Sequence, residues 1–234
     1  MTGVTAIRDD YYRSVAVAPS DDFDADLAAL RDGVRVLGGM VAEGVASAMT
    51  GLESRDGDRL RGVVAGDIEV NERHRQERER GLAVLASQHP IGSRLNEVFG
   101  LMLMTSELER MGDHAKSCAR YALPLIELSS RPRLETILRM GSYVEEQVRD
   151  ILEAVTANDH RRAQDIAARD DRIDRIYHRV FEEMVETMRE QSEWVYAGTN
   201  LIFIAHNLER IADRVTNIAE DLVFLATGRL TELG

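Results

Sequence analysis

The chain has 234 residues, of which 44% are hydrophobic and 30% are charged, a composition typical of a soluble globular protein and too apolar for a disordered one. The formal net charge of −12 argues against a general binder of nucleic-acid backbones. No apolar run approaches the roughly 18 residues needed to cross a bilayer, and no signal-peptide core opens the sequence. The single cysteine, Cys118, excludes an internal disulfide and suits a reducing compartment. We therefore expect a cytoplasmic protein.

The first half of the chain is predicted to form a three-helix bundle over residues 21–128. Residues 1–20 lack clear periodicity and are predicted to be a mobile N-terminal tail. Beyond them, apolar residues recur with a helical period. Pro90 separates the second and third helices, because proline disfavours helical angles at the residue before it. The predicted helices run from about Phe23 to Leu52, Asp58 to Ser87 and Ile91 to Leu128.

The second half repeats this plan after a linker at Ser129–Pro132, giving a second bundle over residues 129–234. No segment alternates with a two-residue period, so no strand is predicted. The helices run from about Pro132 to Ala157, His160 to Gln191 and Glu193 to Gly228. Short loops favour antiparallel neighbours. The predicted fold is therefore all-α, with two tandem three-helix bundles related by an internal repeat.

One motif occurs twice and supports a duplication. Leu-Glu-Arg-Met-Gly-Asp at 108–113 recurs 100 residues later as Leu-Glu-Arg-Ile-Ala-Asp at 208–213. Long-period repeats of this kind usually mark duplicated supersecondary units. Packing alone would preserve the apolar spacing, but it gives little reason to repeat Glu, Arg and Asp. The repeated polar residues therefore indicate a function.

Acidic pairs spaced four residues apart predict one metal site in each half. Side chains at this spacing lie about 40° apart on a helix face. A second pair on the preceding helix could face each motif if neighbouring helices are antiparallel. Oxygen ligands without thiolates suit magnesium, calcium, manganese or iron. The candidate ligands are Asp67, Asn71, Glu109 and Asp113 in the first half, and Asp170, Asp174, Glu209 and Asp213 in the second.

Two other interpretations of these carboxylates stay open. Arg110 and Arg210 could pair with the aspartates three residues later, giving a metal-free helical scaffold. A ferritin-like di-iron protein is the other alternative, although its Glu-x-x-His arrangement is missing. His206 could join a metal shell, but Ser106 stands at the equivalent position of the first half. No nucleophile elbow, P-loop or dinucleotide motif is found, so an enzyme is not predicted.

The doubled Leu-Glu-Arg-x-Gly/Ala-Asp motif resembles that of the PhoU family, accessory proteins of the phosphate-specific transport system. Asp67–Asn71, Gln88–Pro90, Asp170–Asp174 and Asn217–Glu220 add to the resemblance, which covers about Phe23 to Gly228. It implies two tandem three-helix bundles and a regulator of phosphate homeostasis. When phosphate is plentiful, such a regulator would negatively modulate the phosphate-sensing histidine kinase and the high-affinity transporter.

The resemblance also implies partners and ligands. The expected partners are the ATPase subunit of the transporter and the kinase, which would hold the protein at the membrane periphery; a homodimer stays open. Some members bind iron or zinc clusters through acidic motifs, so iron, zinc, magnesium or manganese is expected at the eight candidate ligands. Asn71 stands where a carboxylate is usual, Ala212 where glycine is usual, and Ser117 where the second half has Asn217. We therefore expect the second site to be the stronger.

Overall fold

The protein is all-helical over the residues that the computed structural model describes, which are 22–129, 132–228 and 233. This confirms the predicted fold class. The predicted tail, residues 1–20, lies outside the described residues. The helices are α2 (Phe23–Ser54), α3 (Gly57–Gln88), α4 (Ser93–Ile126), α5 (Glu135–Ala157), α6 (His160–Ala167), α7 (Asp170–Glu190) and α8 (Val195–Thr227), with a 3-10 turn, η1 (Ser192–Trp194), before α8.

The helix predicted from His160 to Gln191 is divided in two. α6 ends at Ala167, and α7 begins at Asp170 after a short turn. The other predicted helices are present, with ends that differ from the prediction by a few residues. The first candidate ligand of the second half, Asp170, is therefore the first residue of a helix instead of lying inside one.

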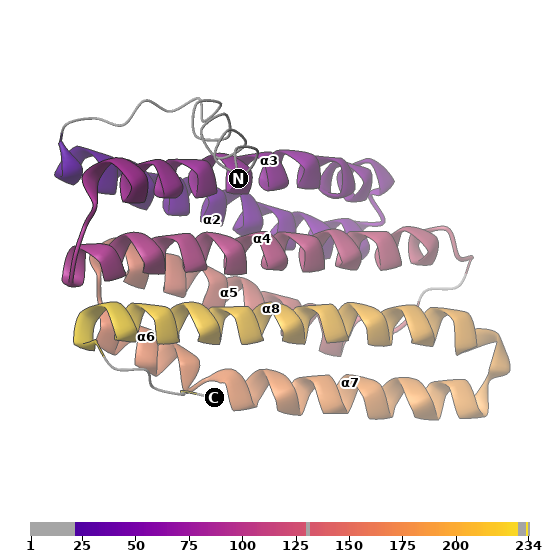
Figure 1. Ribbon diagram of the computed structural model, residues 1–234. Helices are drawn as coiled ribbons and strands as arrows, with labels where there is room; N and C mark the ends of the chain where they lie inside the picture. Colours follow the sequence, from indigo (N-terminus) through magenta and orange to yellow (C-terminus); the bar gives the residue numbers. More distant parts are fainter. Residues whose placement is uncertain (1–21, 130–131, 229–232, 234) are drawn as a thin grey trace, which may run out of the picture.

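The long helices form two layers (Figure 1). α3, α4, α8 and α7 lie side by side in that order, and α4 and α8 meet in the middle of the layer. α2 packs behind α3 and α4, while α5 and α6 pack behind α8, and α2 also contacts α5. The two halves of the chain are thus joined by the α4–α8 and α2–α5 contacts.

Aspartates cap the N-termini of three of the helices, α2, α3 and α6. The side chain of Asp22 accepts hydrogen bonds from the backbone N–H groups of Asp24 and Ala25 at the start of α2. Asp56 caps α3 through the N–H of Arg59, and Asp159 caps α6 in the same way. Such caps satisfy N–H groups that have no partner inside the helix and stabilise it by about 1 kcal/mol each.

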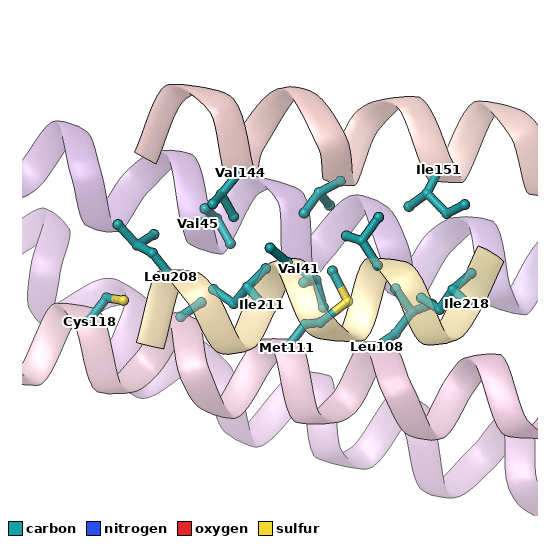
Figure 2. Packing of buried hydrophobic residues seen from close by; sticks show 14 of the residues in the cluster. Val41, Val45, Leu108, Met111, Cys118, Val144, Ile151, Leu208, Ile211 and Ile218 are labelled. Carbon is teal, nitrogen blue, oxygen red and sulfur yellow. The ribbon is translucent and has the colours of Figure 1, made fainter. Parts of the chain in front are cut away.

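A continuous core runs between the layers and is centred on α4 and α8. The leucine and the next apolar residue of each repeated motif, Leu108 and Met111 on α4 and Leu208 and Ile211 on α8, are fully buried. Figure 2 shows these four side chains within the cluster that joins the two halves. The same turns of helix that hold the core therefore also carry the candidate ligands.

Among the described residues, none of the helices is both long and apolar enough to span a membrane.

Candidate functional site

Each copy of the repeated motif lies beside the helix that carries the other acidic pair of its half, because α4 packs on α3 and α8 packs on α7. We call the two candidate sets the first cluster (Asp67, Asn71, Glu109 and Asp113) and the second cluster (Asp170, Asp174, Glu209 and Asp213). All eight residues lie within described helices. The predicted pairing of neighbouring helices is therefore observed in both halves.

The first cluster is held together by a lysine. Lys116 Nζ on α4 lies 2.6 Å from Asp67 Oδ2 on α3 and 3.0 Å from Asp113 Oδ1. The side-chain amide of Asn71 donates a second hydrogen bond, of 3.0 Å, to Asp67 Oδ2. Three of the four candidate ligands are thus brought together, and a positively charged group lies between two of them.

The remaining groups of the first cluster are less well satisfied. Asp67 is only 7% exposed, and its second oxygen, Oδ1, is buried without a hydrogen-bond partner. Burial, followed by repulsion from Asp113, raises the pKa of Glu109. The charge of Asp67 adds to this effect, and that of Lys116 opposes it. Glu109 therefore belongs to the same electrostatic cluster.

The second cluster consists of four carboxylates that repel one another. Burial, followed by repulsion from Asp174 and Asp213, raises the pKa of Asp170 to about 6. Burial also raises the pKa of Glu209, with further repulsion from Asp213, Asp174 and Asp170. The pKa of Asp213 is raised for the same leading reason. The structure thus brings all four predicted residues within range of one another's charge.

Only part of this negative charge is neutralised. Arg210 Nη1 lies 2.8 Å from Asp213 Oδ2. His206 borders the cluster, with Nδ1 3.5 Å from Glu209 Oε2, but burial lowers the pKa of this histidine. Glu209 Oε2 is itself buried without a hydrogen-bond partner. A cation at this place would relieve both the repulsion and the unsatisfied oxygen.

The two clusters differ in how well their residues suit a metal ion. Among the described residues, no three His, Cys, Asp or Glu side chains are gathered closely enough to hold an ion as they stand, so both ligand sets stay predictions. Each cluster has one buried carboxylate oxygen without a hydrogen-bond partner, but the second cluster offers four carboxylates, which suits a hard cation. The first cluster already has an ammonium group between Asp67 and Asp113.

The comparison with protein-family models is decisive. The model described as "PhoU domain" matches residues 34–122 and again residues 137–222, which together make up more than half of the chain. The chain belongs to the PhoU family. The two matched segments follow the internal repeat, and the resemblance seen in the doubled motif is confirmed.

Relatives of this PhoU-family chain match it over nearly its whole length. A "Phosphate-specific transport system accessory protein PhoU homolog" from Caulobacter vibrioides is 33% identical over 207 residues, which cover 88% of this chain and 90% of the relative. The crystal structure of the phosphate transport system regulatory protein PhoU from Streptococcus pneumoniae is 32% identical, covers 91% of this chain and 100% of its own, and has a TM-score of 0.85. PhoU from Pseudomonas aeruginosa is 31% identical, covers 89% and 100%, and also has a TM-score of 0.85.

Two alternatives to a PhoU-type metal site are a ferritin-like di-iron protein and a metal-free scaffold with arginine–aspartate pairs. Belonging to the PhoU family decides against the ferritin-like interpretation. The predicted arginine–aspartate pairing is observed for Arg210 and Asp213. In the first half it is wrong, because Arg110 pairs with Glu107, 2.9 Å away, instead of with Asp113. The metal-free scaffold stays open for this PhoU-family protein.

Sequence reasoning missed the polar contacts between the two halves. Arg214 Nη1 on α8 lies 3.2 Å from Glu107 Oε2 on α4, and Asn217 donates to the same oxygen at 3.0 Å. His114 Nδ1 on α4 lies 2.9 Å from Asn207 Oδ1 on α8. The repeat contained a usable signal, because 107 and 114 are 100 residues before 207 and 214. The two contacts are therefore counterparts under the internal symmetry.

Proposed function

We propose that this protein is an accessory regulator of a phosphate-specific transport system that acts through protein–protein contacts. When phosphate is plentiful, it restrains the high-affinity transporter and keeps the phosphate-sensing histidine kinase from activating phosphate-starvation genes. Its proposed partners are the ATPase subunit of the transporter and the kinase, which it contacts at the cytoplasmic face of the membrane. The observation that carries this proposal is the near full-length match to accessory proteins of that system.

The surface of the α4–α8 pair supports a role in protein contacts. Phe99 on α4 is 51% exposed, and Phe203 on α8 is 43% exposed. The ring of Phe203 stacks on that of Tyr121, with centroids 4.9 Å apart. Exposed aromatic side chains held by rigid helices are typical of interaction surfaces. The relatives named above are accessory and regulatory proteins, which agrees with the prediction of a protein that is not an enzyme.

We further propose that the second cluster binds a metal ion, with Asp170, Asp174, Glu209 and Asp213 as ligands and iron, zinc, magnesium or manganese as the ion. The supporting observations are the mutual repulsion of the four carboxylates and the unsatisfied Glu209 Oε2. When bound, the ion would neutralise this charge and fix α7 against α8. Its role would be structural or part of partner recognition.

The regulatory proposal is tested by deleting the gene. Starvation genes should then stay active in high phosphate, and the wild-type gene on a plasmid should restore repression. Complementation with Phe99→Ser should fail if this aromatic side chain contacts a partner, whereas Ile68→Ser, at a still more exposed apolar position on α3, should restore repression. Normal repression in the deletion strain would contradict the proposed function.

The metal proposal is tested by elemental analysis of purified protein. A Glu209→Ala/Asp213→Ala variant should contain less metal than the wild type. A matched control, Glu182→Ala/Glu190→Ala, removes two exposed carboxylates from α7 and should retain the wild-type content. Equal metal in the wild type and the cluster variant would remove the site from consideration.

A further inference from the structure

The two clusters arise from the same repeat but do not have the same chemistry. Lys116 is the only lysine of the chain, and Thr216 stands 100 residues later in the second half. Thr216 is a buried neutral residue. The first half therefore has a positive side chain at a place where the second half has none.

The contacts of Lys116 are those of a cation held by ligands. Its ammonium group bridges α3 and α4 by binding Asp67 Oδ2 and Asp113 Oδ1 at 2.6 and 3.0 Å. Asn71 supplies an N–H donor to the same Asp67 oxygen. An ammonium group carries a full unit charge and three donors, so it can satisfy two carboxylates at once.

We propose that Lys116 is the resident cation of the first cluster, so that this half excludes metal and the protein binds its ion in the second half alone. The inference rests on the proposed metal site of the second cluster. A divalent ion on Asp67 or Asp113 would lie beside the ammonium group and be repelled by it. It would also have to displace two hydrogen bonds from Asp67 Oδ2.

Among the described residues, no lysine or arginine bridges α7 and α8 at the second cluster. Arg210 pairs with Asp213 alone, and Arg214 pairs across the α4–α8 contact with Glu107. In the described part of the chain, Asp170 and Asp174 pair with no arginine or lysine. The charge of these two carboxylates, and the buried Glu209 Oε2 that has no hydrogen-bond partner, are therefore left for an external ion to satisfy.

Manganese binding tests the proposal, with Mn²⁺ bound per chain measured by equilibrium dialysis and elemental analysis. The Glu209→Gln/Asp213→Asn variant should lose the Mn²⁺ that the wild type binds. Adding Lys116→Met to that variant should restore saturable binding in the first half, and a further Asp67→Asn should abolish it. Arg120→Met, which removes an exposed charge from the same helix, is the matched control and should restore nothing.

The other outcomes of this experiment decide between exclusion of metal by Lys116 and metal binding by the second cluster. If Lys116→Met adds no Mn²⁺, or if the Glu209→Gln/Asp213→Asn variant keeps ions that Asp67→Asn removes, Lys116 is not the excluding cation. If the wild type binds no Mn²⁺ but Lys116→Met does, exclusion by Lys116 stands and the second-cluster proposal fails. If no variant binds, both are wrong.

A measurement on the wild type avoids dependence on variants that fold poorly. Protein labelled with ¹⁵N in lysine alone gives one side-chain ammonium signal, because Lys116 is the only lysine. Its hydrogen exchange should be slower than that of free lysine, and saturating Mg²⁺ should leave its chemical shift unchanged. Fast exchange, or a shift as Mg²⁺ binds, would overturn the proposal.

Discussion

Two adjacent glycines on α2, Gly38 and Gly39, provide a sharp test of the packing between the two halves. A Cβ atom at Gly38 would lie 2.2 Å from Leu152 Cδ2 on α5, whereas a Cβ atom at Gly39 would meet nothing within 4 Å. Alanine in place of glycine inside a helix stabilises it by about 1 kcal/mol at either position. Overpacking at Gly38 costs about 3 kcal/mol, because most of the leucine side chain would have to move.

The two substitutions should therefore have opposite effects on the free energy of unfolding. Gly39→Ala should raise it by about 1 kcal/mol, and Gly38→Ala should lower it by about 2 kcal/mol. For a chain of this size, thermal unfolding followed by circular dichroism should give melting temperatures about 3 °C higher and about 6 °C lower, respectively. Equal shifts for the two variants would refute the close α2–α5 contact.

Three further predictions concern buried polar groups. Burial, followed by repulsion from Glu107, raises the pKa of Asp221 to about 7, so the folded protein loses stability as the pH rises from about 4 to 7. In urea titrations, Asp221→Asn should therefore be about 2 kcal/mol more stable than the wild type at pH 8 and about as stable as the wild type at pH 4. Arg214→Met removes one of the two arginines that pair with the largely buried Glu107 carboxylate and should cost about 1 kcal/mol, whereas Arg61→Met, which breaks an exposed pair, should cost under about 0.5 kcal/mol. The Cys118 thiol, which is buried and has a pKa raised to about 12 by desolvation, should react with a thiol reagent only after unfolding.

The helices and their packing partners could be predicted because their causes are local. A buried stripe with a helical period specifies each helix, and short connections make sequential helices neighbours. The acidic pairs follow from the same geometry, since residues four apart share a helix face. The proximity of the four carboxylates of the second cluster could be predicted from these two local rules.

The division between α6 and α7 could not be predicted in the same way. Apolar residues continue at helical spacing through the turn, with Ile166 buried before it and Ile173 buried after it, and neither glycine nor proline marks the site. Long-range contacts accompany the break. Arg169 in the turn forms a 2.8 Å ion pair with Asp150 on α5, and α6 packs on both α5 and α8.

The role of Lys116 was hidden for a related reason. Its spacing from Asp113 is local and visible, but its shorter contact is with Asp67, which lies on another helix and 49 residues away. A pattern of acidic residues predicts where carboxylates cluster, but it does not reveal which side chain from a distant part of the sequence pairs with them. The same limit applies to Arg214, which lies one residue after Asp213 but forms its ion pair with Glu107 on α4.

The internal symmetry explains why these differences could arise without loss of the fold. The contact between α4 and α8 contains Glu107 with Arg214 on one side and Asn207 with His114 on the other, so equivalent positions hold an ion pair in one case and a histidine–amide contact in the other. The buried residues of the motif stay apolar in both copies. The apolar core therefore holds the helices together in both copies, while the polar positions around it differ between them. One half has a lysine between its carboxylates, whereas in the other only Asp213 pairs with an arginine.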